Sequence, residues 1–277
     1  MIMETVEWKW NSRDGIQMYA RNWKPSDPKA VVVLVHGLGE HINRYHHVAE
    51  AFANANYAMQ GFDLRGHGQS AGQRGYTPGY ESLMDDITDF IADARQRYPG
   101  LPVFLYGHSM GGNQVINYAL RSPQAIKGVI ATGPWLKLAF TPPAAQVMIA
   151  KLLNNLVPSF SLSSALDQKA LSRDPEVVSK YAADPLVHDK ISVRLYTSIY
   201  TNGFWALEHA AELKIPMLLM HGASDKITSA PASQDFARLA GKIVTLRIWD
   251  GFYHEIHNEP EKADVIQAMV SWLDKNL

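Results

Sequence analysis

The chain of 277 residues contains no cysteine, which excludes disulfide bonds, thiolate metal ligands and cysteine nucleophiles. It also has little net charge. Its 26 lysines and arginines against 27 aspartates and glutamates give −1, too weak a field to gather nucleic acid or an acidic membrane surface. No apolar run is long enough to span a membrane, and residues 1–10 lack the pattern of a signal peptide. We therefore expect a soluble, cytoplasmic protein.

What the chain does contain is a regular alternation of apolar, β-branched runs with helical patterns. Its 47% hydrophobic and 19% charged residues are typical of a globular protein, and its length suits one large domain. The runs predict strands and the amphipathic stretches between them predict helices. The eight expected strands cover residues 6–10, 16–23, 30–35, 57–62, 103–106, 128–132, 216–220 and 243–249.

Strands that alternate with helices predict a mostly parallel sheet joined by right-handed crossovers. This alternation of strands and helices stops after residue 134 and resumes near residue 206, and the intervening segment is rich in proline. We therefore expect an α/β fold: an eight-stranded, mostly parallel sheet with helices on both faces and a helical cap. Residues 1–134 and 206–277 would form the single core, and residues 135–205 the cap.

The sequence GHSMG, at residues 107–111, is the clearest chemical motif. An apolar run precedes it and a helical pattern follows, so Ser109 lies at an expected strand-to-helix turn. The two glycines allow the neighbouring backbone to pass close to that turn, and the hydroxyl would project from the edge of the sheet. This pattern predicts a nucleophilic serine. A five-residue Gly-x-Ser-x-Gly alone also occurs by chance in glycine-bearing loops.

A serine hydroxyl needs a base that accepts its proton and an acid that orients the base. A nucleophilic serine at such a turn is typical of the α/β-hydrolase fold, in which the acid and the base both follow later strands, in the order serine, acid, histidine. Asp225 follows the strand ending at residue 220 and is our candidate for the acid, although a turn aspartate that only satisfies local amides is the common alternative. Asp250 is the rival. His254, on the loop after the last strand, is the candidate base, with His257 a neighbour of the site.

The oxyanion of an acyl-transfer intermediate needs backbone donors. We expect one from the amide of Met110, directly after the serine. The other should come from Leu38, which lies between two glycines in the loop after the strand at residues 30–35. A glycine-rich turn or a phosphate cradle is the alternative for this loop, but the nucleotide-binding glycine patterns are absent. His-Glu-x-His is one residue too short for the motif that places two zinc ligands on one face of a helix. Acyl transfer through a serine ester calls for no metal or organic cofactor, so we expect none.

Taken together, these motifs resemble the monoacylglycerol lipases, α/β hydrolases allied to lysophospholipases. The resemblance implies Ser109, Asp225 and His254 as catalytic triad, with Leu38 and Met110 as oxyanion donors. It also implies that three further residues lie near the alcohol end of the substrate: Glu40, Arg44 and His257. The alternative for Glu40 and Arg44 is a salt bridge that fixes the loop, and for His257 a position at the start of a helix without substrate contact. The motifs that carry it are HGLGEH at residues 36–41 with Arg44 and Tyr45, DLRGHGQS at 63–70, GHSMGG at 107–112, HGASDKI at 221–227 and HEIHNE at 254–259.

The expected reaction is hydrolysis of a monoacylglycerol to glycerol and a free fatty acid through an acyl-enzyme on Ser109. The alternatives are a lysophospholipase or general carboxylesterase, a peptidase acting on proline-rich peptides, and a non-catalytic ligand-binding relative. The substrate is expected to be a small lipid ester. The apolar stretch at residues 144–157 suggests an acyl channel that rests transiently on a membrane or lipid droplet, although it could equally be the cap's own core.

Overall fold

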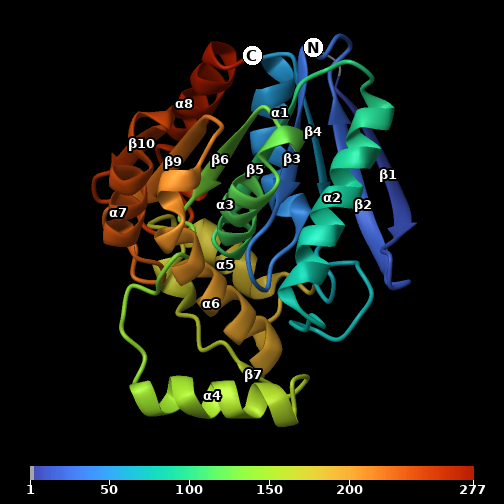
Figure 1. The fold of residues 1–277 in the computed structure, drawn as a ribbon. Coiled ribbons are helices and arrows are strands. Elements are labelled where there is room, and N and C mark those ends of the chain that lie inside the picture. Colours follow the sequence, from blue (N-terminus) through green and yellow to red (C-terminus); the bar gives the residue numbers. More distant parts are fainter. Residues whose placement is uncertain (1–2) are drawn as a thin grey trace.

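The computed structural model describes residues 3–277 and has an eight-stranded main sheet (Figure 1). The spatial order of the strands is β1-β2-β4-β3-β5-β6-β9-β10. The first two strands pair antiparallel, β2 also pairs antiparallel with β4, and all other pairs are parallel. This confirms the expected fold class. The strands are β1 (Glu4–Asn11), β2 (Gln17–Lys24), β3 (Ala30–Val35), β4 (Tyr57–Phe62), β5 (Val103–His108), β6 (Gly128–Thr132), β9 (Met217–Gly222) and β10 (Val244–Trp249).

Helices cover both faces of this sheet and bury two separate cores. Because side chains alternate along a strand, Val31 and Val33 enter one core while Val32 and Leu34 enter the other. Every residue of β3 is buried, which explains why its sequence is continuously apolar. One face is covered by α1 (His46–Asn54) and α8 (Lys262–Lys275), and the other by α2 (Tyr80–Arg97), α3 (Met110–Arg121), α6 (Val193–Glu208) and α7 (Ala230–Ala240).

The segment between β6 and β9 interrupts the alternation, as expected, but it holds more regular structure than its sequence predicts. It contains α4 (Ala144–Leu156), β7 (Ser161–Ser163), α5 (Pro175–Ala183), β8 (Lys190–Ser192) and α6. In Figure 1, α4 lies apart from the sheet, below the rest of the molecule, and none of its residues is buried. The expected boundary at residue 205 falls inside α6, whose buried residues Leu195, Ile199, Ala206 and Leu207 belong to the core on the face of the sheet that α2 and α3 cover.

No helix within residues 3–277 combines the length and the apolar character needed to cross a bilayer. The parallel strands instead define where chemistry is placed. Their carboxyl ends meet at one edge of the sheet, where ligands bind in open α/β folds. The loops that follow β3, β5, β6, β9 and β10 therefore converge there, and they carry the residues singled out from the sequence.

Candidate active site

Ser109 occupies the sharp turn between β5 and α3. Its backbone has φ 53° and ψ −114°, a strained conformation for a residue with a side chain. The flanking glycines are required because the backbone is so close. A Cβ on Gly107 would lie 2.4 Å from the carbonyl oxygen of Gly111, and one on Gly111 only 2.0 Å from that of Val35. The turn therefore has the geometry that the motif predicted, and Ser109 is 8% exposed.

Asp225 and His254 meet at the same edge of the sheet, although 29 residues separate them in the chain. The Nδ1 of His254 donates to Oδ2 of Asp225 over 2.7 Å. The other carboxylate oxygen accepts the backbone amides of Ile227 at 2.7 Å and Thr228 at 3.0 Å, so the turn after β9 holds the acid in place. Because a carboxylate only accepts hydrogen bonds, the proton of the neutral imidazole lies on Nδ1 and leaves Nε2 as its basic atom.

The electrostatics of this pair favour its charged forms. Burial disfavours an imidazolium, but the attraction and hydrogen bond of Asp225 outweigh it and raise the pKa of His254 above 6.5. Burial likewise opposes ionisation of Asp225, yet the two histidines that donate to it, His254 and His221, hold its pKa well below 3.8. Asp225 is therefore an anion throughout the neutral range.

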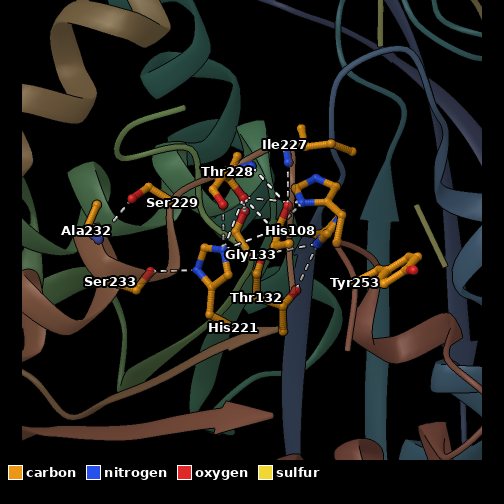
Figure 2. Close-up of polar contacts among 12 residues, drawn as sticks. His108, Thr132, Gly133, His221, Ile227, Thr228, Ser229, Ala232, Ser233 and Tyr253 are labelled. Carbon is orange, nitrogen blue, oxygen red and sulfur yellow. Dashed lines mark hydrogen bonds and ion pairs between the residues drawn. The ribbon is translucent and has the colours of Figure 1, made fainter. Parts of the chain in front are cut away.

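Two further side chains contact Asp225 that the sequence did not reveal. The hydroxyl of Thr228 lies 2.8 Å from Oδ2, and Nε2 of His221 lies 3.0 Å from the same oxygen. Figure 2 labels both of these side chains. One signal could have pointed to His221: it is the polar residue near the end of an otherwise apolar strand, MLLMHG. Gly133 completes the surroundings. Its φ is +50°, and a Cβ there would lie 3.3 Å from Nδ1 of His254.

Ser109 and His254 both line one cavity of about 630 Å³ beneath the segment between β6 and β9. Leu38 lines it too, from the loop after β3. Met110 is the first residue of α3, so its amide is among those that find no acceptor within the helix. The rest of the lining is largely apolar and includes Leu138, Phe140, Leu162, Leu166, Ile191 and Tyr196. This arrangement suits a substrate with a long apolar part.

The three residues assigned to the alcohol end of the substrate occupy different positions. Glu40 lines the cavity, whereas Arg44 and His257 are absent from the lining that residues 3–277 form. His257 is fully buried and stacks on Tyr45, with ring centroids 4.8 Å apart. Within the described residues, neither of its ring nitrogens has a hydrogen-bond partner. Contact of Arg44 and His257 with substrate stays a prediction.

Arg44 joins the loop after β3 to the loop after β10. Its Nη1 donates to Glu40 at 2.6 Å, and its two terminal nitrogens donate to Glu255 at 2.7 Å each. Glu40 in turn accepts the amide of Gly37 at 2.6 Å and the hydroxyl of Tyr45 at 2.7 Å. Burial raises the pKa of Glu40. Burial also disfavours the charge on Glu255, but the bidentate contact with Arg44 prevails and lowers the pKa of that carboxyl.

The sheet topology, the serine at a strained strand-to-helix turn and the buried histidine–aspartate pair define the α/β-hydrolase class. Comparison with known sequences agrees with this class. The family described as serine aminopeptidase, S33 (Hydrolase_4) matches residues 26–261, and this chain belongs to that family.

Its relatives include lipases. A monoacylglycerol lipase of Mycolicibacterium smegmatis is 36% identical over 95% of this chain and 95% of its own length. An uncharacterized abhydrolase domain-containing protein of Dictyostelium discoideum is also 36% identical over 93% of this chain. The matched region covers only 28% of that longer protein. Among solved structures, the monoacylglycerol lipase of Paleococcus ferrophilus is 36% identical and superimposes with a TM-score of 0.86 over the full length of both chains. The resemblance noted from the motifs is thereby confirmed.

Proposed function

We propose that this chain is a serine ester hydrolase that converts monoacylglycerols to glycerol and free fatty acid. The observation that carries the proposal is that Ser109 and His254 line the same largely apolar cavity while His254 is hydrogen-bonded to the buried Asp225. Monoacylglycerol lipases at 36% identity over nearly the full chain support the choice of substrate.

In the proposed cycle, Nε2 of His254 accepts the proton of the Ser109 hydroxyl as Oγ attacks the ester carbonyl carbon. Asp225 stabilises the imidazolium that forms, and the amides of Leu38 and Met110 bind the oxyanion. The tetrahedral intermediate then collapses, and the alcohol leaves with the proton from His254. A water molecule attacks the acyl-enzyme by the same sequence of proton transfers, which releases the fatty acid and restores Ser109.

The proposed substrate has two ends of opposite polarity. Its acyl chain matches the apolar lining of the cavity, and its glycerol hydroxyls need hydrogen-bonding partners, which Glu40 on the cavity wall offers. Arg44 donates to Glu40, and His257 stacks on Tyr45, whose hydroxyl donates to the same carboxylate. Both would therefore act on this end through Glu40.

This mechanism predicts the pH dependence of the reaction. His254 must be neutral to accept the proton, and its pKa is raised above 6.5, so activity is lost as the pH falls through that raised value. We expect the acid limb of kcat/KM for a soluble ester to lie above pH 6.5. A profile measured from about pH 5 to 9 checks this, and a limb near the ordinary pKa of a carboxylic acid, about 4, would contradict the role of His254.

We also propose that residues 135–205 act as a cap whose helix α4 rests on lipid surfaces. Four of its apolar side chains are exposed to unusual degrees: Met148 by 69%, Ile149 by 54%, Leu152 by 60% and Leu156 by 68%. Lys151 is the one charged residue of this helix. An apolar, weakly charged helix at the mouth of an apolar cavity suits delivery of a lipid from an interface.

Replacing Met148 and Leu152 with glutamate tests this role of α4. Because burying each such side chain in lipid is worth about 1.5–3 kcal/mol, we expect turnover of long-chain emulsions to fall about tenfold or more. Hydrolysis of a short soluble ester should stay within about twofold, since neither residue lines the cavity. Leu239→Glu, at an exposed leucine of α7, is the matched control. Equal losses on both substrates would contradict the proposal.

A substrate panel tests the reaction itself. The purified chain is assayed with monoacylglycerols, lysophospholipids, short p-nitrophenyl esters and aminoacyl or prolyl amides of the kind the family description suggests. We expect the highest kcat/KM on monoacylglycerols and no measurable amide cleavage. A preference for lysophospholipids would favour the phospholipase alternative, and turnover confined to short esters would favour a general carboxylesterase.

A further inference from the structure

We propose that His221 is a positioning residue that fixes the carboxylate of Asp225 and weakens the electrostatic attraction between Asp225 and the imidazole of His254. The inference deepens the proposed function and rests on it, because it assumes that Asp225 and His254 serve Ser109. His221 belongs to β9, whereas the two residues it would govern lie in the loops after β9 and β10.

The geometry places two imidazoles on one oxygen atom. Oδ2 of Asp225 receives Nδ1 of His254 at 2.7 Å and Nε2 of His221 at 3.0 Å. The side chains of His221 and Asp225 are both 0% exposed, so water does not compete for these contacts. A second donor to this buried oxygen stabilises part of the negative charge of the carboxylate and restricts rotation of the carboxylate group.

A second contact sets the tautomer of His221. Its Nδ1 lies 2.8 Å from the hydroxyl of Ser233, a fully buried residue in the first turns of α7 (Figure 2). In the neutral ring, one proton on Nε2 serves the carboxylate, and the lone pair on Nδ1 accepts the hydroxyl proton. Ser229 caps the same helix by accepting the amide of Ala232 at 3.2 Å. A hydrogen-bonded chain therefore runs from α7 through β9 to the acid.

The consequence concerns the proton affinity of His254. Loss of the His221 donor leaves more negative charge on Oδ2 opposite His254, which raises the pKa of the imidazole. It also leaves the carboxylate with one contact fewer. The amides of Ile227 and Thr228 and the hydroxyl of Thr228 still hold it opposite the ring, but less tightly, which lowers kcat. Within residues 3–277, the titratable or charged groups next to His254 besides Asp225 include the rings of His108 and His257 and the carboxylates of Glu40 and Glu255, which Arg44 joins. All of these are unchanged by substitutions at residue 221.

The test compares His221→Leu with His221→Gln, because the glutamine amide reaches the position of Nε2 and keeps a donor. For His221→Leu we expect kcat to fall about tenfold with little change in KM, as for loss of a hydrogen bond to a charged group. The acid limb of kcat/KM should move up by about half to one pH unit. His221→Gln should restore the limb to that of the unchanged chain and recover most of kcat.

Two serines at the start of α7, the N-cap Ser229 and the buried Ser233, provide matched variants in case residue 221 does not tolerate replacement. Ser233→Ala removes the contact with His221 and should shift the acid limb in the same direction by a smaller amount. Ser229→Ala weakens the cap of the same helix but leaves that contact intact, so it should lower Tm and leave the limb in place.

Acid limbs that coincide for the unchanged chain, His221→Leu and Ser233→Ala would overturn the inference. So would a His221→Gln variant no better than the leucine variant. Failure of the proposed function gives a different result: either the unchanged chain does not hydrolyse the ester, or Ser109→Ala keeps its activity. An inactive Ser109→Ala together with an unshifted limb in His221→Leu overturns the positioning role alone.

Discussion

Replacing Ser109 with alanine is expected to abolish ester hydrolysis. The change removes the only atom proposed to form the acyl-enzyme, and loss of a nucleophilic serine lowers kcat by roughly 10⁵–10⁶-fold. Folding should be preserved, because alanine deletes one oxygen and leaves the two flanking glycines, which the turn requires, in place. The measurement is kcat on a monoacylglycerol, together with covalent labelling by a fluorophosphonate probe.

The matched control for this variant is Ser164→Ala. Ser164 lines the same cavity as Ser109 but lies in the segment between β6 and β9. It should keep both turnover and labelling to within about threefold, as expected for a change outside the machinery. Labelling that persists in Ser109→Ala would show that another residue is the nucleophile. Unchanged turnover by Ser109→Ala would show that the reaction does not proceed through an acyl-enzyme on residue 109.

Replacing Asp225 with asparagine is expected to cost about 10⁴-fold in kcat, the second largest effect. The amide nitrogen would donate where the carboxylate accepts, so His254 would take the other tautomer and present a protonated Nε2 to Ser109. The two backbone amides that hold the turn can still find the remaining oxygen. KM should change little, because Asp225 is fully buried behind the histidine.

Asp250→Asn distinguishes between Asp225 and Asp250, the two candidates for the acid that the sequence analysis identified. Asp250 is exposed and follows β10 directly, whereas Asp225 follows β9. Its replacement should leave kcat within about twofold, as for other surface substitutions. A loss for Asp250→Asn comparable to that for Asp225→Asn would contradict the assignment of the acid.

The sheet could be predicted from the sequence because its strands are buried on both faces. A run such as AVVVLV has few alternatives to a central parallel strand, and all eight expected strands are present. Residues after the ends of such strands share one edge of the sheet, so Ser109, Asp225 and His254 could be grouped before any geometry was known. Their roles stay predictions until the variants are measured.

Helix α6 could not be predicted, because its stability comes from packing and not from local propensity. Its sequence is rich in β-branched and aromatic residues, and Gly203 occurs within it. That glycine is needed because a Cβ would lie 2.3 Å from the carbonyl oxygen of Leu136. Only the assembled core supplies the contacts that offset these weak preferences.

The contacts of Thr228 and His221 with Asp225 could not be predicted either. They depend on how the turn at residues 225–228 folds back over the end of β9, and this geometry leaves no periodic trace in the sequence. The same holds for Arg44 and Glu255, which are 211 residues apart. Polar side chains that meet only through loops are the part of a site that sequence patterns describe least well.

The span of the Arg44–Glu255 contact has a consequence for how the protein matures. During synthesis, the N-terminal two thirds of the chain can collapse around β3 to β6 long before residue 255 leaves the ribosome. Until then Arg44 has Glu40 but no second carboxylate, and His254 has not yet emerged either. Pairings so distant along the chain close late, because the entropy of a long loop opposes them. If Ser109 and His254 have the roles proposed above, catalytic competence is acquired only at the last stage of folding, and the nascent polypeptide carries the nucleophile without its base.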